Sequence, residues 1–256
     1  MNLVVDQAWA AGTLLLWIRL GVLFFMTPVL SGFNGPPAFL ALFSLVLAGL
    51  LCAGMPAPAS APSLPASVGG FVWAALLEVG LGSVLAFGVH AAFAAFGMAG
   101  RILDLQIGFG TASVFDPVTR VDSPVLGVVL NNLAVILFFA LDGHHAFIRG
   151  IAFSVAQLPP GAMALHVSPV AVVGQFGAIF TLALAMASPV LFMLLLLETG
   201  LAVVSRMLPQ MNVYFVGLPL KLLAGIAMLA ASATAMAPVM ARAFASIFKF
   251  WDEVLR

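Results

Sequence analysis

Charged side chains are rare in this chain, so the few that occur are the first candidates for chemistry. There are 9 Lys and Arg and 9 Asp and Glu among 256 residues. A dense group of them lies in residues 100–124, where apolar runs flank Arg101, Asp104, Asp116, Arg120 and Asp122. This segment has two interpretations: a solvated loop between two membrane helices, or a loop inside a pore.

The backbone of the same segment is predicted to leave the helical conformation. Gly108 and Gly110 cost backbone entropy in a helix, and Pro117 lacks an N–H and clashes with the preceding turn. The sequence therefore predicts a flexible, polar loop in the middle of an apolar protein. Composition alone favours the solvated loop. The pore loop stays open as the alternative, because non-helical backbone at membrane depth is tolerated only where protein buries it or where it lines a cavity.

Three further charged or titratable residues lie inside apolar runs. Arg19 interrupts the first run, and a charge at that depth normally faces a partner, here expected on a neighbouring chain, or a cavity. Glu78 and His90 are twelve residues apart, which places them near one face of a helix. They could form a proton relay, but an interhelical polar contact explains the pair equally well.

The residues Asp142-Gly143-His144-His145 suggest a zinc site at first sight. A zinc site needs three or four ligands arranged in space, and only His90 and His166 remain as further histidines. The sequence therefore favours a helix end whose polar side chains meet backbone groups. No metal and no cofactor are expected.

Composition and motifs exclude several classes of function. Net charge is zero, and no basic run with aromatic residues suggests nucleic acid. No nucleophile motif, phosphate loop or HExxH helix occurs. Cys52 is the single cysteine, so an intramolecular disulfide is excluded. The chain is not expected to be an enzyme.

The elements that must position these residues are apolar helices. Hydrophobic residues make up 64% of the chain and charged residues 7%, against about 25% charged in an average soluble domain, and mean hydropathy is +1.22. This predicts an all-α, polytopic membrane protein. Pro189 is expected to kink the fifth run into two segments. Residues 147–158 are expected to form a short helix, and residues 242–256 a mildly amphipathic C-terminal segment. The six long runs are 8–30, 38–54, 68–97, 125–140, 170–204 and 213–241.

Four motifs, in order along the chain, together resemble the FliR family, the flagellar type III export-gate component, and its injectisome relative, the T-component. In place of basic residues typical of the family, Ala38-Phe39-Leu40 follow Pro37. The motifs are Arg19 with Thr27-Pro28-Val29-Leu30-Ser31; Leu105-Gln106-Ile107-Gly108-Phe109 with Phe115-Asp116-Pro117; Asp142-Gly143-His144 with Leu158-Pro159-Pro160-Gly161; and Arg206-Met207-Leu208-Pro209-Gln210-Met211-Asn212-Val213 with Val216-Gly217-Leu218-Pro219-Leu220.

The resemblance implies a non-enzymatic gate subunit in the bacterial inner membrane at the flagellar basal body. Five copies of a P subunit and four of a Q subunit would join one copy of this chain in a helical pore for unfolded secreted proteins, with a B-type export switch subunit and membrane lipid as further contacts. The resemblance also implies four buried charges that stabilise the fold or contact other subunits: Arg19, Glu78, Glu198 and Arg206. The central loop, residues 106–122, would plug the pore through Gln106, Ile107, Gly108, Phe109, Gly110, Val114, Phe115, Asp116 and Pro117.

The resemblance covers residues 1–256 as one export-gate domain. Within it, residues 1–54 are expected to form the first helical hairpin, residues 68–146 the helices that flank the central loop, and residues 147–256 the C-terminal helices.

Three other functions stay open at this stage. The first is the equivalent T-component of a virulence type III injectisome. The second is a small secondary transporter that uses Glu78, His90 and helices broken at Pro189 and Pro219. The third is an intramembrane hydrolase that uses Asp142 and His144.

Overall fold

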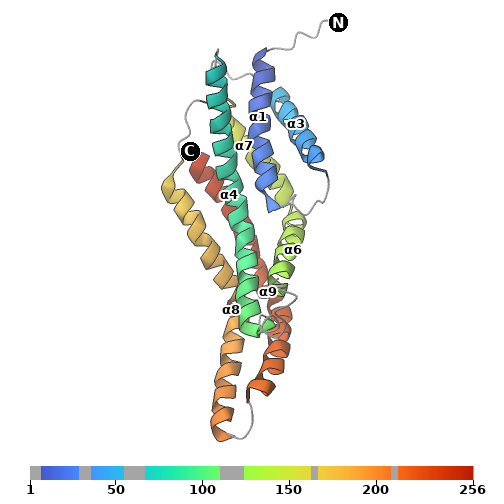
Figure 1. Cartoon of the computed structure of the whole chain (residues 1–256), viewed down its shortest axis with the longest axis vertical. Helices are drawn as coiled ribbons and strands as arrows, with labels where there is room; N and C mark the ends of the chain where they lie inside the picture. The colour runs from blue at the N-terminus through green and yellow to red at the C-terminus, as the bar shows by residue number, and fades with distance from the viewer. Residues whose placement is uncertain are drawn as a thin grey trace, which may run out of the picture. The chain divides into compact units, whose positions relative to one another are not determined.

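The computed structural model describes residues 7–28, 36–54, 67–109, 124–162, 167–208 and 213–255. Within these ranges the regular structure is helical, as Figure 1 shows, and the predicted all-α class is confirmed. Five helices are long and apolar enough to cross a membrane, or up to six if α6 and α7 count as one broken span. The helices are α1 (Gln7–Met26), α3 (Pro37–Gly54), α4 (Val68–Ile107), α6 (Val125–Ala140), α7 (Gly143–Gln157), α8 (Pro169–Met207) and α9 (Val213–Leu255).

Helix α4 is the largest departure from the predicted boundaries. The third apolar run was expected to end at residue 97, yet α4 continues to Ile107, so residues 100–107 are helix and not loop. Gly100 is accommodated there because it meets Gly127 closely: a Cβ on Gly100 would lie 2.4 Å from the Gly127 Cα. The loop prediction for residues 100–107 is therefore wrong. The predicted helix 125–140, in contrast, is confirmed as α6.

Helices α8 and α9 are longer and more continuous than the prolines in their sequences suggested. Pro189 lies inside α8, which remains one helix. Because proline has no N–H, the Ala185 carbonyl loses its usual helical donor, and the Ser188 hydroxyl donates to that carbonyl at 2.9 Å. In α9 the last apolar run and the predicted C-terminal segment join in one helix despite Pro219 and Pro238.

The chain forms two compact units, each assembled from segments distant in sequence. Unit 1 contains Met1–Ala91, Asp142–Gln175 and Ser246–Arg256, and unit 2 contains Ala92–Leu141 and Phe176–Ala245. Helices α4, α8 and α9 therefore supply residues to both units.

The core of unit 1 is built around Trp251 near the C-terminal end of α9. Trp251 is 1% exposed, and its indole Nε1 donates to the Leu85 carbonyl at 3.0 Å. Its ring lies directly against Gly150, where a Cβ would come within 2.5 Å of the indole ring. A close helix contact thus explains the glycine at position 150 in α7.

In the same unit, α3 lies alongside α1 (Figure 1). The Trp17 indole Nε1 on α1 donates to the Ala41 carbonyl on α3 at 3.0 Å and to the Ser44 hydroxyl at 3.1 Å. The rest of α3 is strongly apolar, and only 11% of its span is buried within the chain. Such a helix needs lipid or another protein around it, as expected for a membrane protein.

The core of unit 2 is a cluster of phenylalanine rings. Phe244 of α9 lies at the centre, with ring centroids 5.3 to 5.7 Å from its three neighbours. These distances lie in the favourable range for offset or edge-to-face aromatic pairs. The neighbours are Phe93, Phe96 and Phe138, so the cluster ties α9 to α4 and α6.

Candidate functional site

A buried ion pair in unit 1 joins the first and third of the predicted apolar runs. Arg19 on α1 is 1% exposed and Glu78 on α4 is 3% exposed. The Arg19 Nε lies 2.6 Å from the Glu78 Oε2, and the Arg19 Nη2 lies 3.1 Å from the Oε1. This is the two-point arginine–carboxylate geometry that fixes direction as well as distance.

The remaining donors of Arg19 are directed to the end of α7. Its Nη2 donates to the Leu158 carbonyl at 2.9 Å, and its Nη1 donates to the carbonyl and hydroxyl of Ser154 at 3.3 and 3.4 Å. A guanidinium has five N–H donors, and all of them are engaged here. Arg19 thereby supplies a donor to the carbonyl of the C-cap residue Leu158, and it adds a second donor to the Ser154 carbonyl, which already accepts the Leu158 N–H.

Glu78 also holds the turn that follows α7. The Gly161 N–H donates to the Glu78 Oε1 at 3.0 Å, and Gly161 has a φ of 85°, a conformation that favours glycine. The motif Leu158-Pro159-Pro160-Gly161 is thus fixed against α1 and α4 by one charged pair. Arg19 and Glu78 neutralise each other within the chain, and a contact of either with another subunit stays a prediction.

The suggested proton relay between Glu78 and His90 has no support in the contacts. Glu78 is buried against Arg19, whereas His90 is exposed. In the described part of the chain the two side chains share no hydrogen bond or ion pair. Their helical spacing alone therefore does not bring them together.

The central segment begins in unit 2 at the end of α4. Gln106 and Ile107 form the last turn of α4, and Gly108 follows with a φ of 101°. Because this φ is unfavourable for residues with a side chain, Gly108 is where the helix can stop. Phe109 follows it, whereas five other predicted plug residues lie outside the described ranges: Gly110, Val114, Phe115, Asp116 and Pro117.

A pocket of about 360 Å³ lies in unit 2 beside the last turn of α4. Its polar lining residues are Gln106 of α4, Glu198 and Ser205 of α8 and Lys221 of α9. The Lys221 Nζ is paired with the Glu198 Oε1, and the Gln106 Nε2 donates to the same oxygen at 3.4 Å. Glu198 was expected to carry buried charge, but its side chain is 34% exposed, so it is only half-buried in this chain.

One carboxylate in unit 2 was not among the predicted site residues. Asp104 on α4 is 4% exposed, and its Oδ1 and Oδ2 accept the N–H groups of Leu126 and Gly127 at 2.9 and 3.0 Å. These are orphan N–H groups of the first turn of α6, where the N-cap residue Pro124 makes no side-chain capping bond. The signal in the sequence was Pro124 directly before α6. Proline has no side-chain oxygen to cap a helix, so the first N–H groups of α6 need an acceptor from elsewhere in the chain.

The predicted residue Arg206 lies in the last turn of α8 and is exposed. A cation at a helix C-terminus is favourable because the unpaired carbonyls there carry partial negative charge. Its expected contact with another subunit stays a prediction.

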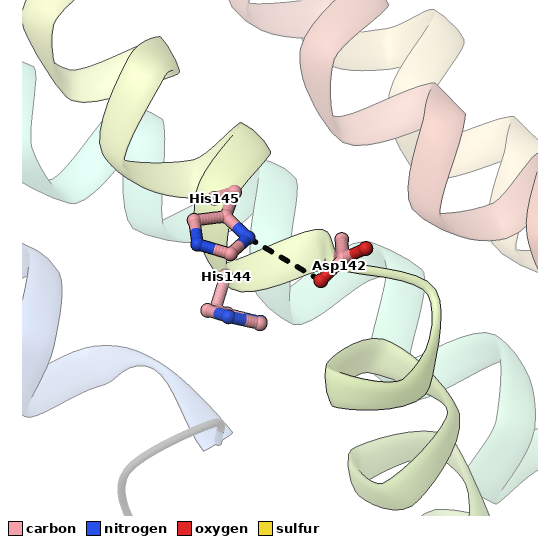
Figure 2. Close-up of side chains that lie close together, drawn as sticks. All are labelled: Asp142, His144 and His145. Atoms are coloured by element: carbon pink, nitrogen blue, oxygen red, sulfur yellow. Dashed lines mark hydrogen bonds and ion pairs between the residues drawn. The ribbon is translucent and has the colours of Figure 1, made fainter.

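Asp142, His144 and His145 gather at the start of α7, where one potential ligand atom from each lies within 4.8 Å of the others. Figure 2 shows the His145 ring directed at Asp142, with a distance of 3.3 Å between its Nδ1 and the Asp142 Oδ1. The His144 and His145 rings are tilted by 37° to each other, with centroids 4.1 Å apart. Asp142 adopts the left-handed conformation with a φ of 55°, which fits the break between α6 and α7.

The fit of this group to a metal ion is poor. The side chains of His145 and Asp142 are 64% and 77% exposed, and the group lies at the positive N-terminal end of α7, which opposes a cation. Three residues from one short stretch also supply fewer protein ligands than a structural zinc site. The Asp142 carbonyl accepts N–H groups of His145 and Ala146, which is the backbone contact of a helix start.

Comparison with known proteins identifies the family. The model of the family "Bacterial export proteins, family 1" matches residues 10–247. The flagellar biosynthetic protein FliR of Escherichia coli K12 is 34% identical over 77% of this chain and 78% of its own length. FliR of Bacillus subtilis 168 is 31% identical over 90% of this chain and 88% of its own.

A relative from another system also matches. The surface presentation of antigens protein SpaR of Shigella sonnei is 30% identical over 82% of this chain and 80% of its own length. The resemblance to the FliR family that the motifs indicated is thus confirmed over nearly the whole sequence. The chain, a polytopic helical membrane protein, belongs to the bacterial export proteins of family 1.

Proposed function

We propose that this protein is a non-enzymatic subunit of the flagellar type III export gate in the bacterial inner membrane. The observation that carries the proposal is the match to FliR proteins across most of the chain, at 34% and 31% identity. Helices long and apolar enough to span a membrane are consistent with a gate that lies in the bilayer. Energy for export would come from other components.

The use of the buried charges supports a structural role rather than catalysis. Glu78 is the most deeply buried glutamate of unit 1, and its carboxylate oxygens accept hydrogen bonds from Arg19 and from the Gly161 N–H. A carboxylate so engaged is poorly placed to accept a proton from a substrate. The same contacts argue against a transporter that cycles a proton through Glu78.

The central segment, residues 106–122, is proposed to plug the pore at rest. Gly108 supports this because its φ of 101° ends α4 and lets the chain change direction. Ile107 and Phe109, together with Val114 and Phe115, supply apolar bulk that could exclude water, as hydrophobic constrictions do in channels. Asp116-Pro117 would fix a turn, and Gly110 would give backbone freedom.

Other subunits are proposed to cover the apolar surface of this chain. Helix α3 is 11% buried and the span in α8 is 33% buried, and much of the remaining surface consists of large apolar side chains. The P and Q subunits, five and four copies with one of this chain, would pack on this surface together with lipid. A B-type export switch subunit and unfolded secreted proteins complete the proposed partners.

The experiment is a deletion of residues 108–115 in cells that carry the whole export apparatus. Small-molecule and ion entry through the membrane should rise strongly, while the P and Q subunits still co-purify with the shortened chain. A deletion of equal length in the Pro- and Ala-rich linker, residues 56–63, serves as the matched control and should stay tight. If the complex with the shortened chain assembles and admits no more ions or small molecules than the wild type, the segment is not the plug.

The similarity to SpaR supports a second candidate, the equivalent subunit of a virulence injectisome. Genetic complementation separates the two systems. The gene should restore motility to a strain that lacks its flagellar FliR, and it should fail to restore secretion to a strain that lacks SpaR. Restored secretion without motility would favour the injectisome.

A further inference from the structure

We infer that Asp104 is a positioning residue of the gate: it fastens the start of α6 to the end of α4, so that both ends of the central segment are held at one place. The inference rests on the proposed plugging function of that segment. It concerns residues on either side of the segment, all of which lie in unit 2.

The contact itself is a two-point cap delivered from a distant part of the chain. The Asp104 Oδ1 lies 2.9 Å from the Leu126 N and the Oδ2 lies 3.0 Å from the Gly127 N. The carboxylate is 4% exposed, so water hardly competes for these bonds. A buried carboxylate that accepts two backbone N–H groups at a helix N-terminus is favoured both by the hydrogen bonds and by the helix dipole.

Close backbone packing makes this contact specific. A Cβ added to Gly100, one turn before Asp104, would lie 2.4 Å from the Gly127 Cα and 2.6 Å from the Leu126 carbonyl oxygen. Two helices that approach this closely leave little room for the carboxylate to shift. The same approach places the Asp104 oxygens opposite the free N–H groups of α6.

The last turn of α4 has a second attachment. The Gln106 Nε2 donates to the Glu198 Oε1, which is also paired with Lys221. Ile107 packs tightly against α9, since a Cβ on Gly225 would lie 2.6 Å from the Ile107 Cγ1. Residues 104 to 107 are therefore fixed to three helices, α6, α8 and α9, immediately before the helix ends at Gly108.

The acceptor for the start of α6 comes from the other side of the central segment. The N-cap residue Pro124 makes no side-chain capping bond, and the Asp104 carboxylate accepts the Leu126 and Gly127 N–H groups. A plug that moves aside and returns needs fixed ends, and this carboxylate provides them.

The test uses the complete apparatus with Asp104→Asn. The asparagine amide keeps the shape but places an N–H₂ opposite a backbone N–H, so one of the two bonds is lost. Spin labels at Leu105→Cys and Val125→Cys, both exposed in this chain and introduced in a Cys52→Ala background, report the distance between the helix ends. Ion entry per assembled complex reports the consequence. Glu253→Gln, on the exposed end of α9, is the matched control.

The expected result is a narrow distance distribution in the wild type and the control, and a broadened one in Asp104→Asn. Ion entry should rise severalfold in Asp104→Asn while the amount of co-purified complex stays close to wild type. Should the asparagine variant fail to accumulate, Asp104→Glu decides. Its longer side chain cannot keep both bonds against the close glycine contact, so broadening and an intermediate leak are expected, and wild-type behaviour would overturn the inference.

Failure of this inference can be told apart from failure of the proposed function. If the deletion of residues 108–115 leaks but Asp104→Asn stays tight, the plug stands and Asp104 is only a cap. If the deletion stays tight, the plugging function is wrong. A narrow distance distribution in Asp104→Asn overturns the positioning role whatever the deletion shows.

Discussion

Each unit contains an ion pair between two helices, and the two pairs differ in burial. In unit 1 Arg19 and Glu78 are 1% and 3% exposed, and every donor of the guanidinium has an acceptor. In unit 2 Lys221 and Glu198 are paired, but their side chains are 28% and 34% exposed and line a pocket. Similar charges therefore form a closed network in one unit and an open one in the other.

The difference distinguishes charged side chains that hold the fold together from charged side chains that remain accessible to water. A buried, fully paired network is costly to disturb because any single change leaves an unpaired group in a low dielectric. A half-exposed pair can lose a partner to water at small cost. The Arg19–Glu78 network is thus expected to be sensitive to the loss of one charge, and the Lys221–Glu198 pair to tolerate it.

The largest predicted effect is that of Glu78→Gln in unit 1. The variant leaves the Arg19 charge buried and places an amide N–H₂ toward either Arg19 or the Gly161 N–H. Loss of one partner of a buried pair costs about 3–5 kcal/mol of folding free energy. Accumulation of the protein in the membrane should fall sharply, as measured by immunoblot, with a lower melting temperature for any complex purified in detergent.

The surface pair Lys249 and Glu253 provides the control, since its side chains are 80% and 47% exposed. Glu253→Gln should accumulate like the wild type. The double variant Arg19→Met with Glu78→Met should recover part of the loss, because no buried charge remains. Recovery is expected to be incomplete, since the Leu158 carbonyl and the Gly161 N–H lose their partners. Normal accumulation of Glu78→Gln would contradict a structural role for this network.

Much of the fold could be predicted because apolar runs between glycine- and proline-rich turns mark membrane helices directly. Helix α6 has the expected bounds, 125–140. The end of α4 was not predicted, because the charged residues after Gly100, followed by Gly108 and Pro117, indicated a loop when considered alone. The helix continues because Asp104 accepts N–H groups of α6 and Gly100 meets Gly127 closely, two contacts that the fold brings from beyond the central segment. Local propensity is overridden there by a tertiary contact.

The candidate site was predictable in residue type but not in partnership. A charge at Arg19 inside an apolar run demands a partner, yet nothing in the sequence distinguishes a partner on another chain from Glu78, 59 positions away. The twelve-residue spacing from Glu78 to His90 suggested a pair that does not form. Asp104 was noted only as one charge of the central segment, because its partners, the Leu126 and Gly127 N–H groups, lie on the far side of that segment and no local pattern connects them.

The second prediction tests the open network with Lys221→Met. The pair is partly exposed, so its loss is expected to cost about 0–1 kcal/mol, and methionine keeps apolar contacts in the pocket. Accumulation and melting temperature should stay close to wild type, in contrast to Glu78→Gln. A loss as large as that of Glu78→Gln would mean that the pocket is closed in the assembled apparatus and that the contrast between the units holds only for the isolated chain.

The smallest effect is expected from His144→Ala combined with His145→Ala at the start of α7. The His145 side chain is 64% exposed and its contact with Asp142 is 3.3 Å long, so its loss removes little. The backbone bonds from His145 and Ala146 to the Asp142 carbonyl do not need either ring, and the helix start should persist. Complex formation should decrease only modestly, and elemental analysis of the purified wild-type complex should give no stoichiometric zinc. One zinc per chain in the wild type, lost in the double variant, would instead show that Asp142, His144 and His145 form a metal site that gains its missing ligand in the assembly. In that case an exposed polar group of unit 1 would also bind a ligand, so the availability of a polar group would follow from its own exposure and not from the unit that contains it.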